Sequence, residues 1–330
     1  MNPTSSIEAS LAGAPSTSMT GNAVEIRGLT KRYGSSADLA LDGLDLTVPR
    51  GSVFGLVGGN GSGKTTTLRT MLGLNLQDSG EALVFGEDSR RLSKATRQRI
   101  GYLSEDEFPY DDIAVVDALQ FVRGFFDEWD WDWCDHLVER LGVDRRKRLD
   151  GMSKGQRRLA EVLLAVAPSP DLLVLDDPAI GLDPSVRRSV LWTLLETVQE
   201  RGTTVLFSSH ILQDVERVVD HVGILHQGKL RVAGELDEIK ERVRRVVLPG
   251  HSAPEILEGE LGREQLGNEV AIVTSSWSEA LADRFADAIS VDRINLEEMF
   301  LAMPGEAMPG EAVSGEKLSG EKLSGEEVSR

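Results

Sequence analysis

Gly58-Gly59-Asn60-Gly61-Ser62-Gly63-Lys64-Thr65-Thr66 is the stretch of sequence that decides the fold. It matches a phosphate-binding loop, in which a glycine and four further residues precede Gly-Lys-Thr. The apolar run from Val53 to Val57 predicts a buried strand, and Thr66 to Leu74 predicts a helix. A glycine-rich turn between a strand and a helix N-terminus directs backbone N–H groups and the helix dipole at an anion. In this pattern Lys64 reaches the β- and γ-phosphates and the Thr65 hydroxyl ligates Mg²⁺, so the sequence predicts a nucleotide site.

Composition restricts the class of protein. The 330 residues are enough for one large or two modest domains, and 40% of them are hydrophobic. No run of 18 apolar residues occurs, so a role at a membrane requires a partner. The net charge of −18 argues against broad nucleic-acid binding and against adsorption to an anionic membrane. Cys134 is the only cysteine, which excludes an intramolecular disulfide and fits a reducing cytosol.

A second chemical landmark follows the apolar run Leu172 to Leu175. Four apolar residues predict a strand buried on both faces, and Asp176 and Asp177 stand at its carboxyl end, where parallel sheets place their ligands. A carboxylate there can hold Mg²⁺ directly or through water. His210 follows another predicted buried strand, 203–207, which makes this histidine a candidate site residue.

The chain divides into four predicted parts. Strand-like patterns at 24–29 and about 39–48, before the phosphate-binding loop, predict an added β-layer beside a parallel sheet. Further strands are predicted at 80–86 and 100–103, and the strand signal is lost from about 111 to 168. A tandem five-residue repeat near the end suits neither helix nor strand. We expect a disordered tail at 1–22, an α/β domain at 23–234 with a helical subdomain at about 106–168, a small α+β appendage at 235–303, and a disordered tail at 304–330.

Aromatic residues gather in the predicted helical subdomain. Phe121, Phe125 and Trp129 are spaced to share one face of a helix. The preferred interpretation is that they form the core of this subdomain. The alternative is an aromatic surface that binds a partner.

With these landmarks in order, residues from about 24 to 235 resemble an ATP-binding-cassette (ABC) ATPase. The stretch 30–34 is similar to the adenine-stacking loop, which would place Tyr33 on the base. Residues 152–156, Met-Ser-Lys-Gly-Gln, are similar to the family signature, whose usual form is Leu-Ser-Gly-Gly-Gln. Asp183 falls in the loop that crosses the dimer in this family, and His210 falls at its switch histidine.

The resemblance implies a P-loop NTPase fold of the α/β class: an ABC-type cassette with a parallel core sheet, an antiparallel β-layer and a helical subdomain. It also implies that two cassettes enclose two ATP molecules with Mg²⁺, as a homodimer or with a paired ABC ATPase. Each phosphate loop would work with the signature of the other subunit. The helical subdomain would drive a separately encoded transmembrane permease, and the chain would be cytoplasmic, peripheral on the inner face of the membrane.

Further stretches are similar to the ATPases of ABC-2-type exporters. They are 125–126 with 129–130, 141–144, the Ser-Lys-Gly-Gln signature, and 295–300. Carried over residue by residue, the resemblance assigns ATP binding to Tyr33, Gly58, Gly59, Asn60, Gly61, Ser62, Gly63, Lys64, Thr65 and Thr66; the signature acting in trans to Ser153, Lys154, Gly155 and Gln156; the dimer loop to Asp183; catalysis to Asp177, His210 and Glu105; and metal binding to Thr65, Asp176 and Glu105.

Two departures from the family pattern concern catalysis. Asp177 stands where the family usually has glutamate, and Glu105 stands where it usually has glutamine. Aspartate is one methylene shorter, which withdraws the carboxylate by roughly 1.5 Å, and a misplacement of about 1 Å can cost on the order of 100-fold in rate. Our hypothesis is that Glu105 supplies the reach that Asp177 lacks; the alternative is a slow enzyme that tolerates both changes.

Three functions remain for comparison. The leading one is the ATP-hydrolysing subunit of an exporter. The second is a nucleotide-binding regulatory subunit with little hydrolysis, which Asp177 favours. The third is a soluble ABC protein of DNA repair or translation, which is disfavoured because the chain lacks a long insertion between Lys64 and Ser153, a second cassette and a basic charge.

Overall fold

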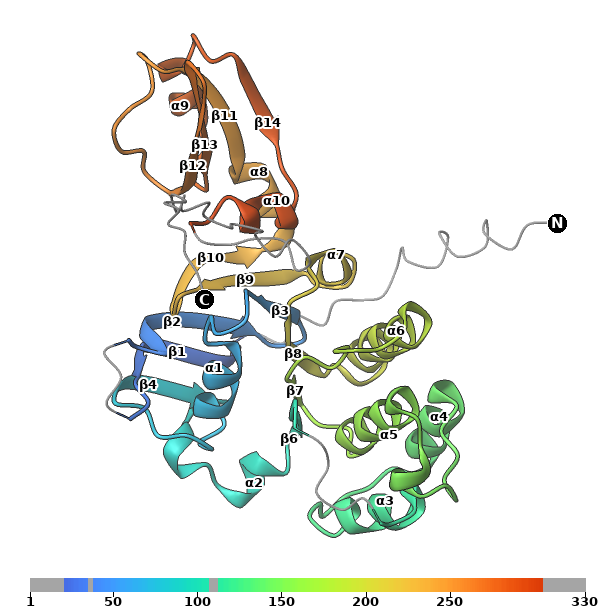
Figure 1. Ribbon diagram of the computed structural model, residues 1–330. Coiled ribbons are helices and arrows are strands. Elements are labelled where there is room, and N and C mark those ends of the chain that lie inside the picture. Colours follow the sequence, from blue (N-terminus) through green and yellow to red (C-terminus); the bar gives the residue numbers. More distant parts are fainter. Residues whose placement is uncertain (1–20, 35–37, 107–111, 305–330) are drawn as a thin grey trace, which may run out of the picture.

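The computed structural model describes residues 21–34, 38–106 and 112–304. The predicted tails at 1–22 and 304–330 lie almost wholly outside the described residues. Three sheets organise the described part of the chain, two in the lower body of Figure 1 and one in the appendage above it.

A six-stranded sheet forms the centre of the body, in the order β10-β9-β3-β8-β7-β6. β3, β7 and β8 are buried along their whole length, because the sheet is covered on both faces. Every neighbouring pair is parallel except β9 with β10. The carboxyl ends of the parallel strands therefore meet at one edge. The strands are β3 (Val53–Val57), β6 (Ile100–Leu103), β7 (Leu172–Leu175), β8 (Thr204–Ser209), β9 (His221–His226) and β10 (Lys229–Glu235).

An antiparallel layer covers one side of this sheet. Its order is β2-β1-β4-β5, with β1 at Asn22–Lys31, β2 at Leu41–Pro49, β4 at Ser79–Val84 and β5 at Glu87–Asp88. Buried and exposed residues alternate along β2, as expected for a strand with one face on a core. Helix α1 (Lys64–Met71) contributes Leu68 and Met71 to the core shared by this layer and the central sheet. The short segments η2 (Ser89–Arg91) and α2 (Lys94–Arg97) lead from the layer to β6.

Helices cover the other face of the central sheet (Figure 1). α5 (Lys154–Val166) is buried along most of its length, and α6 (Pro184–Arg201) contributes Val190 and Leu194 to the same core. α3 (Val115–Arg123) and α4 (Trp131–Leu141) pack outside α5, and η3 (Leu149–Gly151) precedes it. The predicted parallel sheet, antiparallel layer and helical subdomain are confirmed.

The appendage has a four-stranded antiparallel sheet with the order β12-β13-β11-β14. Its own small core includes Val246, Ile272 and Phe285. Its last helix, α10, packs on α7 of the body, and the apolar core of the body continues into α10. The elements are α7 (Leu212–Val215), α8 (Leu236–Arg242), β11 (Arg244–Pro249), β12 (Glu260–Leu266), β13 (Glu269–Thr274), α9 (Glu279–Arg284), β14 (Ser290–Arg293) and α10 (Leu296–Leu301).

Several local predictions were wrong. α1 begins at Lys64 and ends at Met71, so the helix starts two residues earlier than predicted. β12 and β14 were not predicted, because their mostly exposed residues give little apolar alternation.

The predicted aromatic face of a single helix is also wrong. α3 ends at Arg123 with Gly124 as its cap, so Phe125 and Trp129 lie beyond the helix. Phe121 is 46% exposed and Phe125 60% exposed, whereas Trp129 packs against the core. The core aromatic of this region is Trp133, which is 2% exposed.

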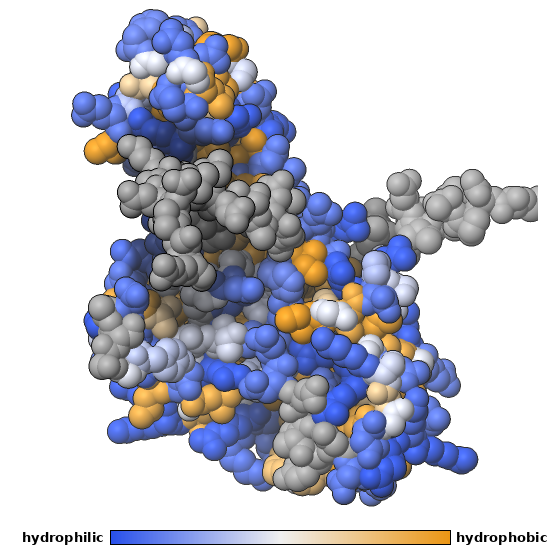
Figure 2. Space-filling model, in the orientation of Figure 1, coloured by the Kyte–Doolittle hydropathy of each residue, from blue (hydrophilic) through white to orange (hydrophobic). Residues whose placement is uncertain are grey.

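The surface agrees with the composition. Figure 2 shows a mostly hydrophilic face on which apolar residues form small, separate patches. Among the described residues, no helix combines the length and apolar character needed to cross a bilayer.

Candidate nucleotide site

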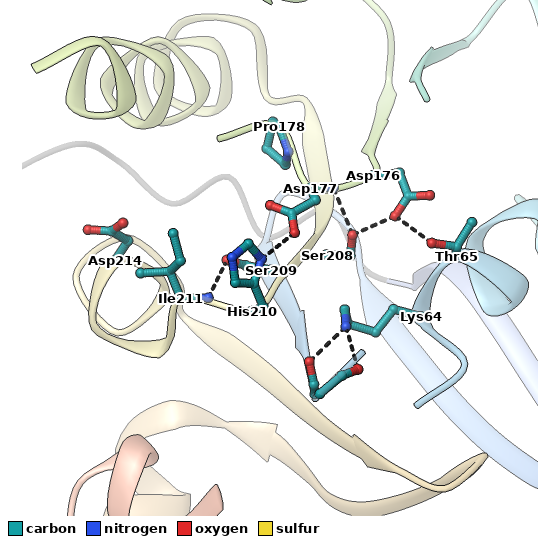
Figure 3. Close-up of polar contacts among 12 residues, drawn as sticks. Lys64, Thr65, Asp176, Asp177, Pro178, Ser208, Ser209, His210, Ile211 and Asp214 are labelled. Carbon is teal, nitrogen blue, oxygen red and sulfur yellow. Dashed lines mark hydrogen bonds and ion pairs between the residues drawn. The ribbon is translucent and has the colours of Figure 1, made fainter. Parts of the chain in front are cut away.

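The phosphate-binding loop lies between β3 and α1. Gly61 and Gly63 have φ of 76° and 109°, values that glycine adopts with little strain. A Cβ on Gly63 would lie 2.6 Å from the Ala40 carbonyl oxygen, so only glycine fits there. Lys64 Nζ donates hydrogen bonds to the carbonyl oxygens of Gly58 at 2.7 Å and Gly59 at 2.9 Å, which draws the ammonium group over the loop (Figure 3).

The first acid of the pair, Asp176, lies against this loop. Its Oδ1 accepts hydrogen bonds from Thr65 Oγ1 at 3.2 Å and from Ser208 Oγ at 2.7 Å (Figure 3). Its Oδ2 is buried and has no hydrogen-bond partner among the described residues. Asp176 is 1% exposed, and a buried polar oxygen without a partner is costly. A carboxylate and a hydroxyl are ligands that Mg²⁺ prefers, so Asp176 and Thr65 fit this ion.

The second acid, Asp177, is paired with His210. His210 Nδ1 and Asp177 Oδ2 are 2.5 Å apart, and this hydrogen bond raises the pKa of His210 above its ordinary value despite the opposing effect of burial. The other oxygen, Asp177 Oδ1, is buried without a hydrogen-bond partner in the described part of the chain. A carboxylate held by a histidine through one oxygen can accept a hydrogen bond from a water molecule through the other.

Ser208 joins the two acids and was not predicted as a site residue. Its Oγ donates to Asp176 and accepts from the backbone N–H of Asp177 at 2.8 Å. The signal in the sequence was the pair of serines, Ser208 and Ser209, that directly follows the apolar residues 205–207 at the carboxyl end of β8. Arg158, also missed, is a buried arginine on α5 that bonds to the backbone around both acids.

Other predicted residues lie around this centre. Tyr33 is 50% exposed, and its hydroxyl lies 3.5 Å from Thr66 Oγ1 and accepts a hydrogen bond from Asn75 Nδ2 at 2.9 Å. Glu105 follows β6 at the same sheet edge as Asp177, because Leu103 pairs with Leu175. Glu105 is exposed and, among the described residues, has no hydrogen bond to Asp177 or Thr65. Its proposed compensation for Asp177 stays a prediction.

The signature residues form a separate, exposed group at the start of α5. Ser153 and Gln156 make a capping box, in which Ser153 Oγ accepts from the Gln156 N–H at 3.3 Å and Gln156 Oε1 accepts from the Ser153 N–H at 3.2 Å. The Lys154 side chain runs along Gly181. No hydrogen bond within the described residues joins this group to the phosphate-binding loop. Asp183, the predicted dimer-loop residue, is the exposed N-cap of α6.

A strand, a glycine-rich turn and a helix that present lysine, threonine and an acidic pair at the edge of a parallel sheet define a P-loop NTPase. A family model described as "ABC transporter" matches residues 41–180, and one described as "AAA domain, putative AbiEii toxin, Type IV TA system" matches 148–213. The bacitracin transport ATP-binding protein BcrA of Bacillus licheniformis is 34% identical over 219 residues, covering 66% of this chain and 71% of its own. The daunorubicin/doxorubicin resistance ATP-binding protein DrrA of Streptomyces peucetius is 31% identical over 311 residues, and the match covers 86% of this chain and 92% of DrrA. The chain belongs to the ATP-binding proteins of ABC transporters.

Solved structures agree on the fold. An ATP-binding subunit of an ABC transporter is similar with a TM-score of 0.60 and 26% identity, covering 66% of this chain and 92% of that one. The dimeric ATP-binding cassette MJ0796 bound to ADP and Pi is similar with a TM-score of 0.58 and 19% identity, and the match covers 64% of this chain and 98% of the MJ0796 chain. The predicted ABC-type cassette fold is confirmed.

Proposed function

We propose that this chain is the ATP-hydrolysing subunit of an ABC exporter, which dimerises around two ATP molecules and drives a separately encoded permease. The observation that carries the proposal is the meeting of Lys64, Thr65, Asp176, Asp177 and His210 at one sheet edge. BcrA is named for bacitracin transport and DrrA for daunorubicin/doxorubicin resistance, and both names support the transport role.

The residues divide the work in this proposal. Lys64 and the N–H groups of the loop bind the β- and γ-phosphates, and Tyr33 stacks on the adenine. Asp176 and Thr65 would hold Mg²⁺, which neutralises charge on the phosphates. Asp177 orients the attacking water through its unpaired oxygen. His210 holds the other oxygen and so fixes the direction of the carboxylate.

A second subunit is proposed because the signature is remote from its own loop. Ser153 and Gln156 are exposed and bond to one another. The N-terminus of α5, with its positive dipole end, would face the γ-phosphate held by another copy or by a paired ABC ATPase.

The permease is proposed to dock on a groove between β6 and the helices α3 and α5. The cavity has a volume of about 270 Å³, and its lining includes Tyr102, Val122, Phe126, Leu164 and Pro168. The exposed rings of Phe121 and Phe125 stand beside it in an edge-to-face pair with centroids 5.2 Å apart. Exposed aromatic rings beside an apolar groove are typical of a binding surface. Such docking would place the chain on the inner face of the membrane.

The test is ATP turnover of the purified chain with Mg²⁺, measured beside Lys64→Ala and Asp177→Glu. We expect turnover that disappears in Lys64→Ala. The Asp177→Glu variant shows whether the shorter acid restricts the rate. ATP binding and dimerisation without turnover would favour the regulatory subunit instead, a function that the short Asp177 supports.

The docking groove has its own test. Co-expression with a permease encoded beside this gene is expected to give a complex that can be purified, and Phe125→Ser is expected to weaken it while basal turnover is unchanged. An unaffected complex would place the interface elsewhere.

A further inference from the structure

Arg158 occupies an unusual position for a charged side chain. It lies in the second turn of α5, is 6% exposed, and donates five hydrogen bonds through its guanidinium group. Four of these five go to backbone carbonyl oxygens, and only one goes to an acid. The partners are Pro178 O at 3.1 Å, Ser104 O at 2.9 Å, Asp176 O at 3.0 Å, Asp177 O at 3.0 Å and Glu161 Oε2 at 3.1 Å.

The four carbonyls belong to two loops at the same sheet edge. Ser104 follows β6, and the other three residues follow β7. Carbonyl groups beyond the end of a strand have left the ladder and need other donors when they are buried. A guanidinium group has five donors in one rigid plane, so a single arginine can satisfy several of them at once. Arg158 therefore ties both loops to α5.

Asp177 shows what this attachment does. Its φ is 43°, in the left-handed region, which is unfavourable for a residue other than glycine. Such a conformation persists only when its surroundings determine it. Here they do so from both sides, because the Asp177 N–H donates to Ser208 Oγ and the Asp177 carbonyl accepts from Arg158 Nη2. The backbone conformation decides where the Asp177 carboxylate points.

Neutralising Glu161 is the alternative role for Arg158. Glu161 is also 6% exposed and bonds to Arg157 Nε at 3.2 Å as well as to Arg158. A buried carboxylate needs a cation. Glu161 also has Arg157 as a cationic partner. Charge neutralisation explains only the bond from Arg158 to Glu161 and leaves its four bonds to carbonyl oxygens unexplained.

We propose that Arg158 is a positioning residue for ATP hydrolysis: it fixes the backbone of Asp177 and couples it to the helix that begins at the signature. The inference rests on the proposed function, since it gives Arg158 a part in ATP turnover. Arg158 acts through the backbone and does not contact the nucleotide loop by any described hydrogen bond. A shift of α5 would move Asp177 with it, so engagement of the signature would be transmitted to the acid of the same subunit.

The experiment measures kcat and ATP affinity separately for a set of variants. Arg158→Gln is expected to lower kcat at least tenfold, since a misplacement of about 1 Å can cost on the order of 100-fold. The Kd for a fluorescent ATP analogue is expected to change less than about twofold, because the phosphate-binding loop is untouched. Arg158→Lys keeps the positive charge but offers one ammonium group for four carbonyls, so its kcat is expected to stay low.

Two further variants separate positioning from stability and from charge. Arg201→Gln removes a guanidinium group that pairs with Asp130 at 2.8 Å and stacks on Trp133, remote from the acids, and is expected to keep full kcat. The double variant Arg158→Gln with Glu161→Gln removes both buried charges, so it remains informative if Arg158→Gln alone fails to fold. Its kcat is expected to stay low.

The outcomes are distinct. Full kcat in Arg158→Lys, or recovery of kcat in the double variant, would show that Arg158 only balances Glu161 and would overturn the proposal. Loss of ATP affinity in proportion to kcat would also overturn it, because that pattern indicates general damage. Absence of turnover in the wild-type chain would refute the proposed function itself.

Discussion

Ser208→Ala is expected to destabilise the chain by more than a single hydroxyl would suggest. Ser208 is fully buried, and its Oγ serves both acids at once, donating to Asp176 Oδ1 at 2.7 Å and accepting from the Asp177 N–H at 2.8 Å. Alanine removes both bonds and leaves a buried N–H group and a carboxylate oxygen short of a partner.

The magnitude follows from these two bonds. A hydrogen bond to a charged group contributes about 1.5–3 kcal/mol, and a buried donor left unpaired costs about 1–3 kcal/mol. Because Asp176 Oδ1 keeps its bond from Thr65, the lower end of each range applies. We therefore expect a loss of about 2.5 kcal/mol in the free energy of unfolding.

Urea unfolding measures this loss, with Ser209→Ala as the matched control. Ser209 is the next residue, is also buried, and makes one neutral bond, in which its Oγ accepts from the Ile211 N–H at 3.0 Å. Removal of this one hydrogen bond in Ser209→Ala is expected to lower the free energy of unfolding by about 1 kcal/mol. If both variants have the m-value of the wild-type chain, all three proteins undergo the same unfolding transition and their free energies can be compared. If Ser208→Ala cost no more than Ser209→Ala, the bridging role of Ser208 would be refuted.

Two further predictions concern other parts of the structure. Gly63→Ala is expected to reduce ATP affinity at least tenfold in a nucleotide titration, because its Cβ would lie 2.6 Å from Ala40 O at a φ of 109°; unchanged affinity would show that the loop adapts. His221→Asn is expected to destabilise the chain at about pH 5.5 but hardly at about pH 8.5. Hydrogen bonding to Asp220 raises the pKa of His221, so its contribution is complete below the unfolded pKa of about 6.5 and is lost as pH rises through the folded value. Equal destabilisation at both pH values in urea unfolding would contradict this.

The central sheet and its site could be predicted because they follow from local patterns. Apolar runs at Val53–Val57 and Leu172–Leu175 gave two strands at their observed bounds, and the residues just after them supplied the phosphate loop and Asp176. In parallel strands the carboxyl ends share an edge, so the meeting of these residues followed from the prediction of a parallel sheet.

The missed features depend on contacts between segments remote in sequence. Ser208 and Asp177 are 31 residues apart, and Arg158 and Ser104 are 54 apart, so no spacing rule links them. Phe121 and Phe125 matched a helical period, but the period alone does not reveal that α3 ends at Arg123. The predicted boundaries of the cassette and the appendage stay predictions.

The packing of α10 on α7 has a consequence for how the chain folds as it is synthesised. Leu296, Met299 and Phe300 belong to the same apolar core as Val215, which follows the strand that carries Ser208. Phe300 is 66 residues after Gly234, the predicted end of the cassette (300 minus 234). At 5–20 residues per second the ribosome needs roughly 3–13 s to supply them. During that interval α7 lacks the helix that packs on it, and a nascent chain halted at Gly234 would expose to chaperones the face of α7 that α10 contacts.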